Sequence, residues 1–600
     1  MPVRSTESRW LASVAGALGP VSIVWSSSLL SGACLAAAFQ PGWGALTWVA
    51  LVPFAAMMGR ERRGDLDLYL GAYYGGVVFH LIGLQWLRTG YSGLMFQAWI
   101  VVAHIAALSW PVALAIGRRL VLRRGLPLAL ALPVCWTAAE YLRYHASAII
   151  DGNGFPFLQA GMTLGDLDPL MQAADLGGVP IVGWLVLGVN GFLGDLWASW
   201  ARRLLTRELA LSFALAALPC LLAWAYGTWR LAEVEAVAGP IVALIPGELE
   251  GQDVAATAAR IEKMVADVVA TIGRPDLLVW QEYAYAGHVS DELRGVPAPM
   301  ADEAARANAL EVVRGRSRPV EERRRATRVN MDFLEQLSRR LGIALAVGCS
   351  RADFAGGDRL FNSLALVTPG GGYQASYDKS YLGPGVEFIP ERARAIGLIP
   401  TFWARRWADL RLSGTMSGRT LRVFDLPTKG REQPYHFSSP ICYDVHFAAL
   451  HRDLVRSARA ATGRSLDFFI GPADEPPDFG EIKSKISTLT HARFRAVECR
   501  TPYLREVQGG QTAIIDGCGR VLQRSSGIGS EQRVLAARVP LDGRPTLFLL
   551  GGDWVSYLAC FLSATLSIRP GLSARRLSRA ADRPDRPGRR NLSSGSSSWR

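Results

Sequence analysis

The stretch VAATAARIEKMVADVVATIGRPDLLVWQE, residues 254–282, contains a helix pattern followed directly by a strand pattern. Its first twenty residues repeat apolar side chains at helical spacing, which predicts a helix over 254–273. The short apolar run at 276–282 follows Gly-Arg-Pro and predicts a buried strand. A helix beside a continuously apolar strand is typical of an α/β sheet covered on both faces. Glu282 ends this strand.

The same alternation continues along the chain. A strand is predicted at 241–247, and the later pattern predicts a helix at 325–342, a strand at 343–350, a strand and turn at 361–372, a strand at 465–474 and a helix at 487–500. Residues 236–546 therefore predict one α/β domain. Within it, the polar, Ala- and Arg-rich stretch 288–328 is interpreted as an insertion or lid.

The residues before this domain have a different character. Apolar runs occur at 19–38, 42–58, 68–87, 94–116, 127–142, 178–199 and 208–227, and another lies at 547–567. A membrane-spanning helix needs about 20 apolar residues. The second and fifth runs are short enough to be partly re-entrant. The pattern predicts a polytopic membrane domain of about seven helices over 1–230, and it disfavours the buried helices of a large soluble protein.

Basic residues indicate the orientation of these helices. Lys and Arg exceed Asp and Glu by 13, and many lie in short loops between apolar runs or in the tail. Cytoplasmic loops of membrane proteins are enriched in Lys and Arg. With a cytoplasmic N-terminus and seven crossings, the basic loops fall inside, residues 236–546 fall outside, and the helix at 547–567 returns a disordered tail, 568–600, to the cytoplasm. No basic face with interleaved aromatic residues is apparent, so nucleic acid is not a predicted partner.

Cysteine spacing and short motifs point to no metal or cofactor. The eight cysteines form no CxxC pair and no metal-ligand spacing. The chain has no P-loop, no GxGxxG before a helix and no HExxH. Disulfides among Cys349, Cys442, Cys499 and Cys518 are allowed by this pattern, but nothing in it requires one.

Three residues of the α/β domain are candidates for catalysis. Glu282 ends one apolar strand, Cys442 ends FSSPIC, and Lys379 lies in ASYDKSYLGPGVEFIP. Catalytic groups are commonly presented at strand ends in α/β proteins. The ordinary alternatives are a solvated loop acid, a surface lysine and a buried core thiol. The chain has 60 Arg and five Lys, so a Lys marks a place where a planar, permanently charged guanidinium does not serve.

The order Glu282, Lys379, Cys442 resembles the Glu-Lys-Cys triad of the nitrilase, or carbon–nitrogen hydrolase, superfamily. The segments that carry the resemblance are YDKSYLGPGVEFIP (377–390), PICYD (440–444), HARFRAVECRTPYLREVQGGQTAIIDGCGRVL (491–522) and GGDW (551–554). Together with the membrane helices, they are similar to the apolipoprotein N-acyltransferase family. The resemblance implies a four-layer α-β-β-α sandwich as the catalytic domain. It also implies supporting roles for Glu387, Tyr443 and Asp444.

The resemblance implies substrates and a location. The acyl donor would be a phospholipid, phosphatidylethanolamine, and the acceptor the α-amino group of a lipoprotein's N-terminal diacylglyceryl-cysteine. The enzyme would lie in the bacterial inner membrane with its catalytic domain on the periplasmic side. The stretch IGLIPTFWARRWADL (396–410) has an interfacial composition and is expected either to dip into the outer leaflet or to form an ordinary amphipathic surface helix.

Four departures from the family pattern bear on substrate identity more than on catalysis. Asp444 stands where Glu is usual, and Pro246 where Gln is usual. GPADEPPDFG (471–480) replaces an Asn-Asp-Ala/Thr-Trp-Phe-Gly motif, and REVQGG (505–510) replaces Arg-Ser/Thr-x-Asn-x-Gly. Three other interpretations therefore remain beside the first. They are a membrane-tethered nitrilase or amidase, an acyltransferase for another amine, and a scaffold that binds lipoproteins without turnover.

Overall fold

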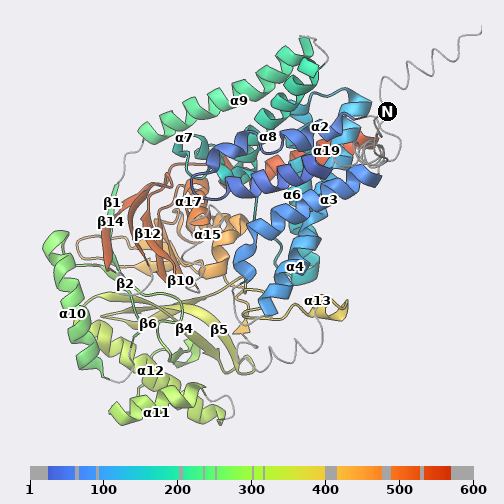
Figure 1. The fold of residues 1–600 in the computed structure, drawn as a ribbon. Helices are drawn as coiled ribbons and strands as arrows, with labels where there is room; N and C mark the ends of the chain where they lie inside the picture. The colour runs from blue at the N-terminus through green and yellow to red at the C-terminus, as the bar shows by residue number, and fades with distance from the viewer. Residues whose placement is uncertain are drawn as a thin grey trace, which may run out of the picture.

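The computed structural model describes residues 25–60, 66–88, 94–201, 207–233, 237–249, 253–300, 303–314, 318–398, 415–475, 488–526 and 533–568. Its N-terminal part is helical, and a two-sheet α/β part follows (Figure 1). The helical part contains a helix over 25–38, η1 Gly44–Trp48, α2 Val52–Met58, α3 Leu66–Gly83, η2 Gln85–Arg88, α4 Leu94–Ala107, α5 Ser109–Arg118, the π-helical turn η3 Arg119–Arg123, α6 Leu128–Asp151, η4 Ala160–Leu164, α7 Asp168–Met171, α8 Ala174–Ala201 and α9 Arg207–Ala232.

Several of these helices fit a membrane protein. Three helices in the described part of the chain are long and apolar enough to cross a membrane, Phe96–Arg123, Ala174–Trp200 and Arg207–Ala232. Gly44–Met58 and Trp554–Ser567 are shorter apolar helices. Seven crossings before the α/β part stay a prediction, because the run at 19–38 is described only from residue 25.

Two helices differ from the apolar runs that predicted them. The run at 127–142 belongs to a longer helix, α6, which continues to Asp151 and ends at Gly152 with a φ of 85°. Backbone hydrogen bonds do not depend on apolar side chains, so a helix continues past its apolar run until a capping residue ends it. The run at 42–58 is divided into η1 and α2, because α2 begins with Pro53 in its first turn.

The α/β part contains two sheets (Figure 1). In the first, the strand order is β14-β1-β2-β4-β5-β6, with β3 beside β4 and β7 beside β5. Its strands are β1 Val237–Leu244, β2 Leu277–Val279, β3 His288–Val289, β4 Ala344–Asp353, β5 Arg359–Thr368, β6 Gly372–Asp378, β7 Thr415–Met416 and β14 Leu535–Leu541. Strands β1, β2 and β4 run parallel, with Val242 opposite Leu277 and Leu277 opposite Ala344.

The second sheet has the order β13-β12-β11-β10-β9-β8. Its strands are β8 Phe424–Leu426, β9 Tyr435–Ser438, β10 Phe468–Asp474, β11 Tyr503–Gln508, β12 Gln511–Ile515 and β13 Val521–Ser526. The remaining helices are α10 Val254–Thr271, η5 Asp291–Leu293, α11 Glu303–Arg314, α12 Val320–Leu341, α13 Glu391–Ala395, η6 Cys442–His446, α15 Ala448–Thr462, α17 Thr488–Cys499, α18 Leu547–Gly551 and α19 Trp554–Ile568.

Alternate residues of the first sheet enter two different cores. Val242, Leu244 and Val279 pack with the second sheet, α15 and α17 in one apolar cluster. Ala243 and Leu278, one residue away on the same strands, pack with α10 and α12 in another cluster. Successive strand residues point to opposite faces, so both faces of this sheet are covered. The prediction of a covered sheet made from its continuously apolar strands is confirmed.

The stretch 288–328 contains regular structure. It includes β3, η5, α11 and the first turns of α12, which begins at Val320 rather than at residue 325. Apolar side chains join α11 to α12, and Arg306 donates to Gln336 at 2.9 Å. Its role as an insertion or lid stays a prediction. Most of the interfacial stretch 396–410 and the whole tail after Ile568 lie outside the described residues.

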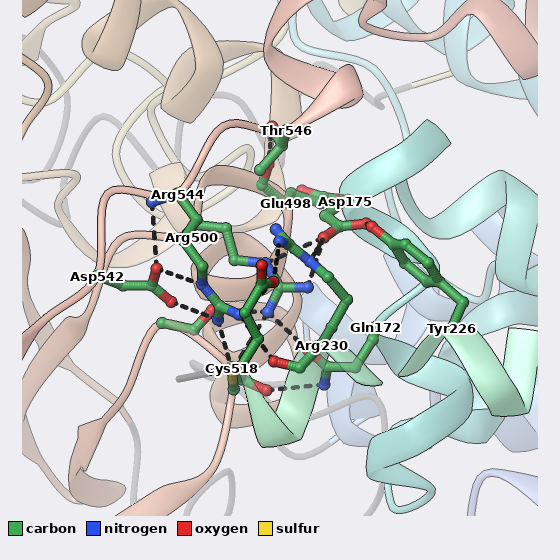
Figure 2. Close-up of polar contacts among 12 residues, drawn as sticks. Gln172, Asp175, Tyr226, Arg230, Glu498, Arg500, Cys518, Asp542, Arg544 and Thr546 are labelled. Carbon is green, nitrogen blue, oxygen red and sulfur yellow. Dashed lines mark hydrogen bonds and ion pairs between the residues drawn. The ribbon is translucent and has the colours of Figure 1, made fainter. Parts of the chain in front are cut away.

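A buried polar cluster joins the helical part to the α/β part (Figure 2). Arg500, at the end of α17, donates to Asp175 of α8 at 2.5 Å and to Gln172 at 2.6 Å. Arg230 of α9 donates to the same Asp175 carboxylate at 3.0 Å, and Tyr226 donates to its other oxygen at 2.7 Å. Asp175 and Arg500 are both fully buried. We call these five residues the junction cluster.

The junction cluster lies beside a break in α8. Gly177 and Gly178 depart from helical geometry, and Gly178 has a φ of 70°. A Cβ on Gly178 would lie 3.1 Å from Phe548 of α18, so glycine here allows both the turn and the close packing. After the break, the backbone N–H of Val179 donates to the buried Glu498 carboxylate of α17. The two parts of the chain are therefore fixed to each other at α8.

Candidate active site

Glu282 lies in a turn that follows β2 and points into the interior. It is 4% exposed. Its Oε1 accepts hydrogen bonds from Lys379 Nζ at 3.0 Å and from Asn362 Nδ2 at 2.5 Å. Its Oε2 accepts from the backbone N–H of Asp474 at 2.9 Å. A buried carboxylate with three donors is held in one orientation.

Lys379 directly follows β6 and is 2% exposed. Its backbone N–H donates to the carbonyl of Asn362 on β5 at 2.8 Å. Its Nζ lies 2.8 Å from Glu387 Oε2 as well as 3.0 Å from Glu282. Burial alone would lower the pKa of Lys379. The charge that Cys442 carries in its thiolate form and the charges of the two glutamates outweigh burial and raise that pKa well above its ordinary value.

Glu387 is the second carboxylate beside the lysine. The backbone N–H of Gly383 donates to its Oε2 at 2.7 Å, and Asn362 Nδ2 donates to its Oε1 at 2.9 Å. Asn362 therefore bridges Glu282 and Glu387. Sequence reasoning missed Asn362, although an amide inside the apolar strand FNSLALVT was a visible signal, because a buried polar side chain needs a partner.

Cys442 begins η6, four residues after the end of β9. Its φ is 48°, a conformation that non-glycine residues adopt at a cost of about 1–3 kcal/mol. The side chain is partly exposed and unbonded to another cysteine. Burial raises the pKa of Cys442 well above its ordinary value, the charge of Glu282 raises it further, and Lys379 opposes both. The resting thiol is protonated and needs a base.

Asp444 connects the cysteine turn to the lysine loop. It is fully buried, and its carboxylate accepts from the backbone N–H groups of Tyr381 at 2.7 Å and Ile441 at 3.1 Å. The Tyr377 hydroxyl donates to it at 3.0 Å. Burial raises the pKa of Asp444 to about 7, against the lowering effect of these donors and Lys379. Asp444 therefore sets the position of Cys442 relative to Lys379.

Tyr443 faces the helical part of the chain. Its ring lies 5.4 Å from that of Phe447 and 6.0 Å from that of Phe157, between α6 and η4. Asn153, also after α6, donates to the Leu382 carbonyl in the lysine loop at 2.7 Å. The loop after α6 thus contacts the segments that carry Cys442 and Lys379.

A charged pair near the nucleophile was not predicted. Arg505 Nη2 lies 2.5 Å from Glu475 Oε1, and the Thr488 hydroxyl donates to the same oxygen. The charge of Glu475 is among those that raise the pKa of Cys442. Glu475 lies in GPADEPPDFG and Arg505 lies in REVQGG, the two stretches that depart from the family pattern. These departures were the only feature of the sequence that pointed to the pair.

The structure brings Glu282, Lys379 and Glu387 into direct contact and places Cys442 within their electrostatic reach. A thiol, a carboxylate base and a cation in this arrangement are suited to nucleophilic acyl transfer. All eight cysteines are free. Within the described ranges, no group of three or more His, Cys, Asp or Glu side chains is placed to hold a metal ion.

Comparison with known proteins defines the class. The carbon–nitrogen hydrolase family matches residues 241–543. The chain therefore belongs to the carbon–nitrogen hydrolase family. The apolipoprotein N-acyltransferase N-terminal domain matches residues 31–192. The resemblance predicted from the sequence, a carbon–nitrogen hydrolase of the apolipoprotein N-acyltransferase kind, is confirmed.

Two relatives match nearly the whole chain, and a solved structure matches about half of it. The chain is 26% identical over 573 residues to the apolipoprotein N-acyltransferase of Geobacter metallireducens, covering 90% of this chain and 95% of that one. It is 25% identical over 574 residues to that of Rhodopirellula baltica, covering 91% and 94%. The crystal structure of Saccharomyces cerevisiae Nit3, of the nitrilase superfamily, matches 51% of this chain and 91% of that chain, with 15% identity and a TM-score of 0.32.

Proposed function

We propose that this protein transfers a fatty acyl chain from a phospholipid to the α-amino group of a lipoprotein's N-terminal diacylglyceryl-cysteine. The acyl chain would be held on Cys442 as a thioester between the two steps. The observation that carries the proposal is the buried Glu282–Lys379–Glu387 cluster beside a protonated thiol. This cluster lies in the same chain as a match to the apolipoprotein N-acyltransferase N-terminal domain.

In the first half-reaction, Glu282 takes the proton of the Cys442 thiol as the sulfur attacks the ester carbonyl of the donor. The tetrahedral oxyanion is stabilised by Lys379 and by a backbone N–H just past Cys442. When the intermediate collapses, the carbon–oxygen bond of the ester breaks and Glu282 returns the proton to the leaving alkoxide. The products are a thioester on Cys442 and a lysophospholipid.

In the second half-reaction, the acceptor amine attacks the thioester carbonyl. The amine must first lose its ammonium proton to solvent, because only the neutral form has a free electron pair. Glu282 then takes one proton from the attacking nitrogen and returns it to the departing sulfur. An amide forms, the carbon–sulfur bond breaks, and the Cys442 thiol is restored.

The supporting residues hold this arrangement. Glu387 and Asn362 fix Lys379 and Glu282 so that the ammonium and carboxylate face the thiol. Asp444 fixes the turn that carries Cys442. Tyr443 lies toward the loop after α6, the direction from which a lipid acyl chain would approach. These roles are positioning roles, since the reacting atoms belong to Cys442, Glu282 and Lys379.

The proposed topology explains why a hydrolase-like domain is membrane-anchored. Phosphatidylethanolamine, the proposed donor, does not leave the bilayer. About seven helices over 1–230 and one over 547–567 would hold residues 236–546, a four-layer α-β-β-α sandwich, on the periplasmic side of the inner membrane. Both termini, including the tail 568–600, would be cytoplasmic.

The test is to incubate the purified protein in detergent with phosphatidylethanolamine and to measure its intact mass. A gain of one acyl chain that hydroxylamine removes is expected for the native protein and not for Cys442→Ser. Adding a diacylglyceryl-cysteine peptide should discharge the adduct into an N-acyl peptide. Release of free fatty acid instead would identify a hydrolase. The absence of any adduct on folded protein would contradict the proposal.

A further inference from the structure

Tyr283 occupies a backbone position that ordinarily suits glycine. The Ala284 N–H donates to the Gln281 carbonyl at 3.3 Å, which closes a turn with Glu282 and Tyr283 as its central residues. Tyr283 is the second of these and has a φ of 54°. Turns with a positive φ at this position favour Gly or Asn, and a bulky residue there is strained.

The side chain of Tyr283 has no hydrogen-bond or ring-stacking partner among the described residues. The side chain is 40% exposed, and it belongs to none of the apolar clusters formed by described residues. Its hydroxyl makes no hydrogen bond to any residue that the structure describes. Tyr285, two positions on, differs in each respect, because it is 1% exposed, stacks on Phe333 and donates to the Asn330 carbonyl.

Tyr283 directly follows Glu282 in the turn, and its phenol is electrostatically coupled to the groups of the active site. Burial raises the pKa of Tyr283, and the charges of Glu387, Glu282 and Cys442 raise it further while Lys379 opposes them. The same turn therefore directs the Glu282 carboxylate inward and carries, on the next residue, a phenol within the electrostatic reach of Glu282, Lys379, Glu387 and Cys442. Strained backbone conformations are concentrated at functional sites.

We propose that Tyr283 is a further catalytic residue whose phenol O–H donates a hydrogen bond to the acyl carbonyl oxygen as the tetrahedral intermediate forms. It would share this oxyanion with Lys379 in both half-reactions. Lys379 already faces two carboxylates, which leaves it one ammonium hydrogen for the oxyanion. A second, neutral donor adds stabilisation without altering the charge balance of the cluster. This inference rests on the acyl transfer proposed above.

The test compares Tyr283→Phe, Tyr283→Gly and the matched control Tyr285→Phe. Acylation of Cys442 is followed by intact mass with phosphatidylethanolamine and, separately, with the water-soluble ester p-nitrophenyl butyrate. Tyr283→Phe should slow both acylations by about 10- to 100-fold, the effect of losing one oxyanion donor at a partly exposed site. Tyr283→Gly should slow them at least as much while raising the thermal midpoint, because the strain is removed. Tyr285→Phe should lower the midpoint and leave both rates unchanged.

Alkylation of Cys442 by iodoacetamide separates this role from an effect on the thiol. Alkylation forms no oxyanion, so Tyr283→Phe should leave its rate unchanged while acylation slows. Native acylation rates in Tyr283→Phe, or an equal fall in alkylation, would overturn the proposal. A native protein that reacts with the soluble ester but not with the phospholipid would contradict the proposed function while still testing Tyr283. Reaction with neither ester would overturn both.

Discussion

Cys442 and Cys518 both lie beside cationic side chains, and the difference between them separates a nucleophile from a structural thiol. Cys518 is fully buried, and its sulfur accepts from Arg500 at 3.3 Å and Arg544 at 3.1 Å. Cys442 is partly exposed, has a left-handed backbone and faces a carboxylate base. A nearby cation is therefore not enough to make a cysteine reactive, since access and a proton acceptor are also required.

The cations differ in the same way. The junction uses Arg230 and Arg500, whose planar groups hold Asp175 through several fixed hydrogen bonds. The active site uses Lys379, one of five lysines in a chain with 60 arginines. A lysine presents a compact charge with donors that follow a moving oxyanion, whereas a guanidinium is suited to a fixed carboxylate. The junction cluster therefore holds fixed charges in place, whereas Lys379 can respond to a charge that forms during the reaction.

Replacing Cys442 and Cys518 in turn tests the difference between the two thiols, and it should give the largest change in acyl-transfer rate. Cys442→Ser should lower acyl transfer by about 10⁴-fold or more, because the weaker serine nucleophile lacks a base strong enough to activate it. Acyl transfer to a fluorescent diacylglyceryl peptide measures the rate. Cys518→Ser is the matched control and should retain activity within about twofold. Comparable losses in both variants would contradict the distinction between the two thiols.

Lys379→Arg tests the choice of cation. We expect a loss of about 10²- to 10³-fold in acyl transfer, since the charge is kept but the longer planar group cannot occupy the space between Glu282 and Glu387. The control is Lys263→Arg on α10, distant from the cluster in sequence and free of the two glutamate contacts. Near-native activity in Lys379→Arg would show that any cation suffices here.

The fold was predictable where periodicity carries the information. The helix pattern at 254–273 and a strand on either side of it are confirmed as α10, β1 and β2, but β2 ends at Val279, so Glu282 lies in the following turn and does not end the strand. Glu282 was recognised at the end of an apolar strand, Lys379 by the scarcity of lysine, and Glu387 through the family resemblance, and the structure brings the three into contact. These residues could be predicted because the apolar pattern marks strand ends and because the family has its motifs in the same order.

Contacts between distant segments were not predictable. Arg500 and Asp175 are 325 residues apart, and nothing in the motif that contains Arg500 indicates Asp175 as its partner. Asn362 looks like one polar residue in a strand until the strand is placed beside Lys379. Tyr283 and Arg500 have positive φ values that residue type alone would argue against. Each of these depends on three-dimensional neighbours that a single sequence does not specify.

The junction cluster should respond asymmetrically to neutralisation. Asp175→Asn leaves Arg500 buried without a carboxylate and leaves Arg230 with Glu233 alone, and it should cost about 3–5 kcal/mol of stability. Arg500→Met leaves the Arg230–Asp175 pair intact and should cost less, about 2 kcal/mol. Thermal midpoints in detergent measure both. A larger loss for Arg500→Met would mean that its contacts with Gln172 and Cys518 matter more than the shared carboxylate.

Asp444, which connects the cysteine turn to the lysine loop, should make the stability of the folded protein depend on pH. Its pKa of about 7 in the folded protein lies above the unfolded value of about 3.9. The folded state therefore binds the proton more tightly, and this contribution to stability falls as the pH rises from about 4 through 7. Asp444→Asn should remove roughly 2 kcal/mol of that decline. Thermal midpoints at pH 5 and pH 8 measure it, and an unchanged difference in the variant would contradict the assignment.

Cys518→Ala should change stability least of these variants. It tests most directly whether the junction cluster and the active site are independent. Removing the sulfur deletes two weak acceptor contacts, but Arg500 keeps Asp175 and Gln172, and Arg544 keeps Asp542. We expect a loss of about 1 kcal/mol in stability and unchanged acyl transfer. Thermal midpoint and transfer rate are measured on the same sample. If the rate falls while the midpoint holds, the junction transmits its geometry to Cys442, and the two clusters are not independent.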